Sequence, residues 1–201
     1  QRQLETALGS FCGLISQTPP MYSALKYHGQ RLYELARAGV TVSRKSRQVK
    51  VYQLKLLDFK LPVVTIEVEC GRGTYIRSLA HDLGKLLSCG AHLKSLIRSR
   101  YGPFDIVDAV SPSQLEDAFR YNHWQDMVYS MDTVLTNWTA VVVSKQQELV
   151  LRNGGPLVLE DVPDGIGSGE QCRAYSQDGC FLAVLRFKPE GGQWRPEKVF
   201  V

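Results

Sequence analysis

The stretch ECGRGTYIRSLAHDLGKLL (residues 69–87) runs from an expected strand through a glycine-rich turn into an expected helix. Apolar residues recur after the turn at helical spacing, which predicts a helix with one buried face. They are Ile76, Leu79, Ala80, Leu83, Leu86 and Leu87. Tyr75 and Arg77 stand at the junction. If helical geometry held from Tyr75, the two side chains would point about 200° apart and line different walls of a pocket.

The glycines of this turn do not complete a dinucleotide fingerprint. A G-x-G-x-x-G motif needs a third glycine where Ile76 stands, and no long βαβ array surrounds the turn. We therefore expect no nucleotide cofactor. From spacing alone, the favoured interpretation of Tyr75 is a half-buried aromatic residue on the helix stripe, and that of Arg77 is a partner in a surface ion pair.

The spacing of apolar residues also predicts helices and strands on both sides of the turn. Leu4, Ala7, Leu8 and Phe11 have helical spacing. Alternation predicts strands over 47–59 and 63–70, and a short helical stripe ends at Gly39, a residue typical of helix ends. Further along we expect an extended segment over 91–100, a capped helix from Ser111-Pro112 with Glu116, and a connector over 122–138.

From Thr139 the pattern changes to short apolar runs separated by Gly, Pro and Asp. Residues 176–179 (SQDG) lie between two such runs and predict a hairpin. The sequence predicts an α+β fold in two parts. Residues 1–138 form a mixed or antiparallel sheet with flanking helices, and residues 139–201 form a small all-β domain.

Composition narrows the class of protein. A hydrophobic fraction of 44% and a charged fraction of 22% are ordinary for a globular chain. Apolar runs such as 140–143 are too short to span a bilayer, and no export leader opens the chain. Five cysteines without a C-x-x-C pair indicate a reducing compartment, and we expect buried thiols. We therefore expect a cytoplasmic location.

Charge and the remaining motifs give two further indications. Residues 26–50 carry seven Lys/Arg against Glu34 alone, which fits either a phosphate backbone as partner or a solvated charged face. His81 and Asp82 are neighbours on a helix and diverge. The other histidines lack partners at ligand spacing, and no serine lies in a G-x-S-x-G elbow. We expect neither a metal site nor a hydrolase triad.

Three blocks together resemble the bacterial TruB family of tRNA pseudouridine-55 synthases, in the order and spacing of that family. They are QTPPMYSALKYHGQRLYELARAG (17–39), VECGRGTYIRSLAHDLG (68–84) and CGAHLKSLIRSRYGPF (89–104). The tail, with LRNG at 151–154 and W-x-P-x-K-V-F at 194–200, is similar to the PUA-type RNA-binding domain, a small barrel that closes many bacterial members.

The resemblance implies a cofactor-free isomerisation of a uridine in the T-loop of tRNA, with the base flipped out of its stack. The family's aspartate nucleophile lies in a G-x-x-D-P-x-x-x-G-type segment, and no such segment occurs in these 201 residues. The chain also begins at Gln1, without methionine and inside an expected helix. We therefore expect a part of a longer protein that is inactive alone, with the segment before Gln1 supplying the aspartate.

The resemblance also implies roles for individual residues. Tyr75 resembles the tyrosine that stacks on the target base and handles its C5 proton, and Arg77 resembles the arginine that pairs with the aspartate. Leu96 resembles an apolar residue near the flipped base. Block 22–39 resembles a mobile insertion that clamps the RNA stem-loop, which implies RNA contacts for Tyr22, Lys26, Arg31 and Arg37.

We therefore expect a monomeric protein that binds the T-arm stem-loop of tRNA. We expect it to bind no metal ion and to contact no membrane. A second hypothesis stays open. The chain is then a non-catalytic tRNA-binding or chaperone module that keeps the corner formed by Tyr75 and Arg77. The residues that precede Gln1 in the parent protein discriminate between the two.

Overall fold

The computed structural model describes residues 1–159 and 170–200. Its backbone divides into two compact units, Gln1–Ile97 and Arg98–Val201. Within the described ranges, no helix is long and apolar enough to cross a membrane.

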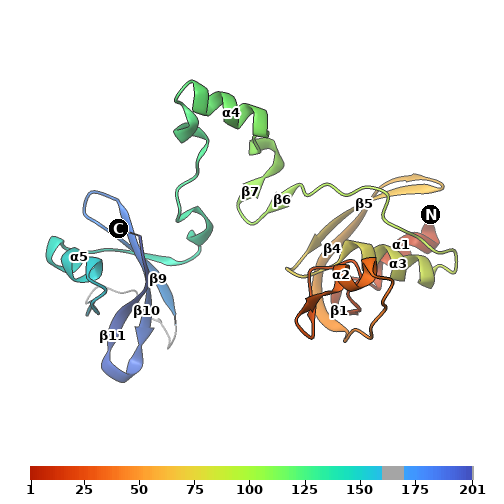
Figure 1. The fold of residues 1–201 in the computed structure, drawn as a ribbon, viewed down its shortest axis with the longest axis horizontal. Helices are drawn as coiled ribbons and strands as arrows, with labels where there is room; N and C mark the ends of the chain where they lie inside the picture. The colour runs from red at the N-terminus through yellow and green to blue at the C-terminus, as the bar shows by residue number, and fades with distance from the viewer. Residues whose placement is uncertain (160–169, 201) are drawn as a thin grey trace. The chain divides into compact units, whose positions relative to one another are not determined.

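The first unit is built on a three-stranded antiparallel sheet, in the order β1-β4-β5 (Figure 1). Strands β4 (Arg47–Lys60) and β5 (Val63–Cys70) form a long hairpin and confirm the two strands expected from alternation. Strand β1 (Gly13–Gln17) pairs with the start of β4 and was not expected as a strand. Its last residue, Gln17, faces Arg47 in the register and is 2% exposed.

Helices α1 (Arg2–Gly9) and α3 (Ile76–Leu86) pack with this sheet, and both expected helical stripes are confirmed. The cluster of buried side chains that they form consists of Leu4, Ala7, Leu8 and Leu83. Partly buried residues of β4 and β5 close the cluster, among them Leu54, Leu56, Phe59, Val64 and Ile66. The apolar face of α3 therefore fixes where its N-terminal end, with Tyr75 and Arg77, meets the sheet.

Between β1 and β4 the chain leaves the sheet as an insertion. It contains a two-residue hairpin, β2 (Lys26–Tyr27) and β3 (Gln30–Arg31), followed by helix α2 (Leu32–Arg37). Leu32 is buried, and its backbone N–H donates to the Leu25 carbonyl. Gly39 follows the helix with a φ of 75°, as expected for a residue just beyond a helix end.

The end of α3 contacts the following segment very closely at Gly84. A Cβ on this residue would lie 2.1 Å from the backbone nitrogen of Ala91 and 2.4 Å from the carbonyl carbon of Gly90. The Gly84 carbonyl also accepts hydrogen bonds from the N–H groups of Cys89 and Gly90. The extended segment expected over 91–100 pairs as a strand only at its end, in β6 (Arg100–Tyr101) with β7 (Phe104–Asp105).

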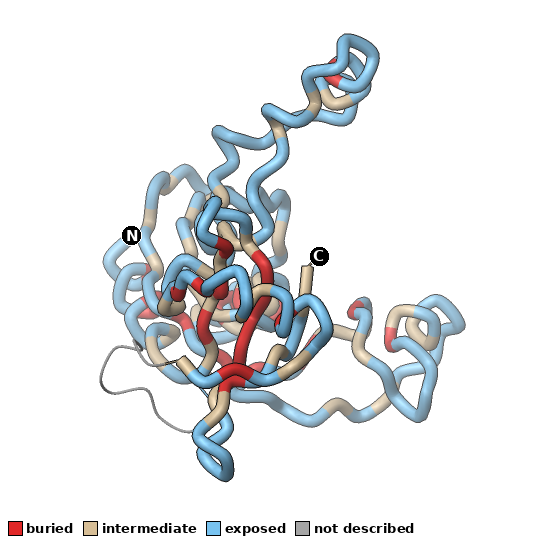
Figure 2. The backbone as a smooth tube through the Cα atoms, turned by 90° about the vertical axis from the view of Figure 1, so that its left-hand side faces the viewer, coloured by how far each residue is buried: buried red, intermediate tan, exposed pale blue. Residues whose placement is uncertain are grey.

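The second unit begins with short helical pieces. Helix α4 (Pro112–Arg120) is capped by Ser111 as expected, although Gln114 rather than Glu116 completes the capping box. The 3₁₀ turns η1 (Ile106–Asp108), η2 (Trp124–Met127) and η3 (Thr133–Leu135) flank it. Only Ala118 is buried between residues 98 and 138, and the tube around α4 is mostly pale blue in Figure 2.

The rest of the second unit is a four-stranded sheet in the order β11-β10-β9-β8. Strands β9 (Gln171–Tyr175) and β10 (Phe181–Lys188) form the hairpin expected at residues 176–179. Strand β11 (Gln193–Val199) follows the turn η4 (Pro189–Gly191) and pairs antiparallel with β10. Strand β8 (Thr139–Val142) pairs parallel with β9, and helix α5 (Lys145–Arg152), absent from the expected strand pattern, follows it. Closure into a barrel stays a prediction.

The cysteines correct one expectation. Cys172 is buried, and burial raises the pKa of its thiol to about 12. Cys12, Cys89 and Cys180 are exposed, so the expectation of buried thiols is wrong for these three. Cysteine spacing carries information about pairing and ligation, but none about burial.

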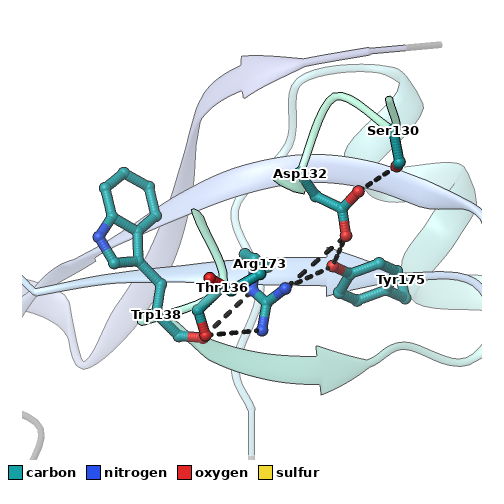
Figure 3. A network of polar contacts seen from close by, with 6 residues as sticks. All are labelled: Ser130, Asp132, Thr136, Trp138, Arg173 and Tyr175. Atoms are coloured by element: carbon teal, nitrogen blue, oxygen red, sulfur yellow. Dashed lines mark hydrogen bonds and ion pairs between the residues drawn. The ribbon is translucent and has the colours of Figure 1, made fainter. Parts of the chain in front are cut away.

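A polar network joins the segment before β8 to strand β9 (Figure 3). The guanidinium of Arg173 donates to the backbone carbonyls of Trp138 and Thr136, and to the Tyr175 hydroxyl. Asp132 lies 3.7 Å from Arg173 and accepts hydrogen bonds from the hydroxyls of Tyr175 and Ser130. The hydrogen bond from Ser130 and then that from Tyr175 hold the pKa of Asp132 below its usual value. The end of the expected connector is therefore bound to the second sheet.

Candidate active site

Tyr75 is the residue at which the turn becomes a helix. Helix α3 begins at Ile76, and Tyr75 is its N-cap with an extended backbone (φ −98°, ψ 106°). The expected 200° separation from Arg77 assumed a helical Tyr75, so it does not apply. Gly73, with a φ of 82°, and a hydrogen bond from the Thr74 hydroxyl to the Gly71 carbonyl shape the turn before it.

The buried side chain of Gln17 holds the backbone of Tyr75 at this position. Its Oε1 accepts a hydrogen bond from the Tyr75 N–H at 3.0 Å, and its Nε2 donates to the Tyr75 carbonyl at 3.3 Å. One amide therefore satisfies both backbone groups of a residue 58 positions away. Tyr75 itself is half-buried.

Two more hydrogen bonds fasten the start of the insertion to α3. The buried hydroxyl of Ser78 donates to the Thr18 carbonyl at 2.9 Å. The Nη2 of Arg77 donates to the Tyr22 carbonyl at 2.6 Å. Residues 17–22 and residues 75–78, which belong to two different blocks of the resemblance, therefore form one structural corner.

Arg77 is exposed at this corner. Among the described residues no ion pair involves Arg77. The expectation that Arg77 is a partner in a surface ion pair is therefore not met within these residues. A guanidinium has five N–H donors in a fixed fork. Its bond to Tyr22 occupies one of them, which leaves donors for a carboxylate.

The insertion concentrates positive charge on a small hairpin. Lys26 and Arg31 lie directly opposite each other across β2 and β3, an arrangement of like charges that destabilises a hairpin unless an anion compensates it. The guanidinium groups of Arg31 and Arg37 lie 5.9 and 5.4 Å from the centre of the Tyr33 ring. Tyr33 therefore gathers two of the three cations expected to contact RNA.

The side chains of Tyr22 and Leu96 are exposed to solvent. Tyr22 is 56% exposed, while its backbone carbonyl is held by Arg77. Leu96 is 62% exposed in the irregular segment after α3, so its side chain is not enclosed against the turn. The structure therefore brings Tyr75, Arg77 and Tyr22 together at one corner and leaves Leu96 outside any enclosed pocket.

A shallow hollow of about 630 Å³ lies elsewhere in the first unit, between the end of α1, strand β1 and the second half of α3. Its lining residues are Ser10, Phe11, Ile15, Ser16, Asp82, Lys85 and Leu86. None of the expected site residues contributes to it. Among the described residues, no group of three or more His, Cys, Asp or Glu side chains is arranged to hold a metal ion.

Gln17 is the residue of this corner that sequence reasoning missed. It occurs inside the first block of the resemblance, at the end of an unexpected strand and two residues before Pro19-Pro20. A polar side chain before a double proline carries no periodic signal, and its partner lies 58 residues away.

Two family models match the chain. The model described as TruB family pseudouridylate synthase (N terminal domain) matches residues 1–76, and the tRNA pseudouridylate synthase B C-terminal domain matches residues 77–138. A protein of Dehalococcoides mccartyi named tRNA pseudouridine synthase B is 39% identical over 198 residues, which cover 98% of this chain and 64% of that protein. A protein of the same name from Francisella tularensis is 55% identical over 114 residues, 57% of this chain and 38% of the relative.

Two solved structures share the fold. One is a crystal structure of a Cbf5-Nop10-Gar1 complex (TM-score 0.76, 23% identity), which covers 100% of this chain and 62% of the matched chain. The other is an H/ACA ribonucleoprotein bound to a substrate RNA containing 2'-deoxyuridine (TM-score 0.75, 20% identity), with 100% and 61% covered. The chain thus spans less than two thirds of the proteins that it matches. Because the two TruB models together account for residues 1–138, the chain belongs to the TruB family of pseudouridylate synthases.

Proposed function

We propose that the parent protein of this chain converts a uridine in the T-loop of tRNA to pseudouridine, and that the corner of Tyr75 and Arg77 forms one wall of its pocket. Parent protein here means this chain together with the residues that precede Gln1 in the whole protein; the resemblance places the aspartate-bearing segment among them. The observation that carries the proposal is the convergence of two family blocks at one corner, through the contacts of Gln17, Ser78 and Arg77.

The chemistry requires the base to leave its stack. The glycosidic bond from C1' to N1 breaks, the base rotates, and C1' joins C5, which then loses its proton while N1 gains one. Extruding a base costs roughly a few kcal/mol, and stacking on an aromatic ring returns about 1–3 kcal/mol per base. A half-buried Tyr75, fixed by its backbone, suits the receiving side of such a pocket.

Arg77 suits a second role in this reaction. A guanidinium beside a carboxylate favours its ionised form, which is the nucleophilic one. Arg77 is exposed and anchored by a single carbonyl. We propose that it pairs with the aspartate of the parent protein.

The insertion suits the RNA stem. Phosphates would relieve the repulsion between Lys26 and Arg31, which lie opposite each other on the hairpin. Arg37, held near Arg31 by the Tyr33 ring, extends the same charged surface. These contacts position the RNA without reading its sequence, since phosphates carry no base information.

The experiment uses unmodified tRNA transcript labelled with tritium at C5 of uridine. The parent protein should release the label to water, because C5 exchanges its proton for the bond to C1'. The 201-residue chain should bind the transcript but release nothing, since its sequence contains no G-x-x-D-P-type segment. Release of the label by the 201-residue chain would show that the nucleophile assignment is wrong.

A non-catalytic tRNA-binding module is the second candidate, favoured by the basic hairpin and by the absence of the nucleophile motif from these 201 residues. It predicts that the parent protein also binds transcript without releasing the label. The two candidates therefore give opposite results for the parent protein in one assay.

A further inference from the structure

The backbone of Tyr75 is fixed by an unusual set of contacts. Its N–H donates to Gln17 Oε1, and its carbonyl accepts both from Gln17 Nε2 and from the N–H of Leu79. The bond from Leu79 belongs to the first turn of α3. By itself it does not fix the direction in which the backbone of Tyr75 enters the helix. The two bonds to Gln17 restrict that direction, because they tie the residue to the end of β1.

The amide of Gln17 has one workable orientation. An amide oxygen only accepts and an amide NH₂ only donates, so reversing the group would break both bonds to Tyr75. The side chain is 2% exposed, which removes water as a substitute partner. A buried polar group is costly unless its hydrogen bonds are made. Gln17 and the backbone of Tyr75 therefore stabilise each other in a single geometry.

We infer that Gln17 is a positioning residue for the reaction: it fixes the backbone of Tyr75 so that the ring is presented to the flipped base. The inference rests on the proposed function for what the ring does, and on the contacts alone for how the ring is held. Gln17 reaches no substrate atom in this role and acts only through Tyr75. Small misplacements of reacting groups cost turnover steeply, of the order of a hundredfold for about 1 Å.

The first test follows the contact itself in the 201-residue chain, by amide hydrogen exchange. Gln17→Met keeps the length and apolar volume of the side chain but removes both hydrogen bonds. Exchange of the Tyr75 amide should accelerate about tenfold, the effect of one buried hydrogen bond, while the amide of Val51 in β4 keeps its protection. Gln17→Asn, which keeps the amide but is one methylene too short to make both bonds, should show the same local effect. Unchanged exchange at Tyr75, or loss of protection throughout the unit in both variants, would overturn the positioning role.

The second test is a double-mutant cycle in the parent protein. Gln17→Met should lower kcat by roughly 10- to 100-fold with the Kd for tRNA within about twofold. In a Tyr75→Ala background the same change should cost no further turnover, because the ring that it positions is gone. Gln3→Met, at an exposed site on α1, is the control and should leave kcat unchanged.

The cycle separates positioning from general stabilisation. An equal loss of kcat in both backgrounds would mean that Gln17 acts by another route, and the inference would be wrong. A wild-type parent protein that makes no pseudouridine would refute the proposed function instead. The exchange experiment does not depend on activity and would still decide how Tyr75 is held.

Discussion

At the scale of single residues, Arg77 is the best-defined group of the corner. Its Nη2 lies 2.6 Å from the Tyr22 carbonyl, so the start of the insertion orients the guanidinium. A planar fork can keep this bond and still offer paired donors to a carboxylate, whereas an ammonium group is a point charge without a fixed direction. The geometry therefore favours arginine for a reason beyond charge.

The first prediction compares Arg77→Ala with Arg77→Lys in the parent protein. Both should lose turnover, by at least about tenfold for lysine because the fork is lost, while the Kd for tRNA changes far less. Single-turnover rates and filter binding measure the two quantities. Arg2→Ala, exposed on α1, is the control. Equal losses of turnover and binding would reject the role of Arg77 as the partner of the aspartate.

The sequence allowed Tyr75 and Arg77 to be found but not Gln17. The first two lie beside the turn and inside a block of the family resemblance, so position and motif agree. Gln17 lies 58 residues from Tyr75 in the sequence, and only folding brings the two residues into contact. No local pattern encodes such a contact, and only the three-dimensional approach of the end of β1 to the start of α3 reveals it.

At the scale of elements, the hairpin of β2 and β3 places Lys26 opposite Arg31, so two like charges form a cross-strand pair. We interpret this as a cost retained for binding an anion. The alternative, a solvated charged face, gives no reason for two cations at one cross-strand pair.

The second prediction concerns this pair. The double change Lys26→Ala with Arg31→Ala should weaken tRNA binding by the 201-residue chain. It should also shallow the slope of log K against log salt by about 2, one unit for each phosphate that the variant no longer neutralises. A salt titration of binding measures the slope. The control pair, Lys55→Ala with Arg2→Ala, removes equal charge at exposed sites outside the insertion. An unchanged slope in the first pair would make the hairpin a solvated face.

The third prediction concerns Gly84 in α3. Alanine in place of a helical glycine gains about 1 kcal/mol in helix propensity, but here its Cβ would overlap backbone atoms of Gly90 and Ala91. Overpacking against backbone costs typically about 1–3 kcal/mol, so Gly84→Ala should be destabilising by up to about 2 kcal/mol net. Thermal unfolding of the 201-residue chain measures this change.

Gly9 provides the matched control. It also lies in a helix, yet nothing lies within 4 Å of the position of its Cβ. Gly9→Ala should therefore be neutral or stabilising by up to about 1 kcal/mol. If both substitutions stabilised the chain equally, the close approach at Gly84 would have no effect on the free energy of unfolding.

Periodicity predicted the elements with strong patterns and missed those without. Helices α1 and α3 and strands β4 and β5 have regular apolar spacing and were found. Strand β1 has its two large apolar residues side by side, so it shows no alternation. Helix α5 is mostly polar, and its signal was the capping box of Ser144 with Gln147, which was overlooked among strand-like neighbours.

At the scale of the whole molecule, the network of Asp132, Arg173 and Tyr175 holds the sheet of the second unit to the segment that precedes β8 within the same unit. Asp132 has a pKa below its usual value in the folded chain, first because of Ser130 and then because of Tyr175. A lowered carboxyl pKa adds stability above the unfolded value of about 3.9, and that stability is lost as pH falls toward the folded pKa.

The fourth prediction follows from this sign. Unfolding of the second unit should become easier as pH drops below about 4, and Asp132→Asn should flatten that part of the profile. At pH 7 the variant should be less stable by about 1–2 kcal/mol, since the charged hydrogen bonds are weakened. Calorimetry between pH 3 and pH 7 measures both effects. Asp126→Asn, at an exposed site in η2, should leave the profile unchanged. Equal profiles for both variants would contradict the network's role.

The boundary between parts was harder to place from sequence than the parts themselves. The change in texture at Thr139 marks where the second sheet begins, and the C-terminal family model ends at residue 138. The backbone contacts instead separate the chain after Ile97. Residues 98–138 pack by local contacts and by the Asp132 network, and composition alone does not reveal which neighbour such a segment joins. The domain limits at residue 138 therefore stay a prediction.

The central claim is that the parent protein modifies a T-loop uridine with the corner of Tyr75 and Arg77 in its pocket. The most direct measurement is position-resolved mapping of pseudouridine in an unmodified tRNA transcript after incubation with the parent protein, beside its Arg77→Ala variant. The account predicts a single new pseudouridine in the T-loop, which the variant does not form although it still binds the transcript. Pseudouridine confined to another arm, or a T-loop product formed equally well by Arg77→Ala, would contradict it.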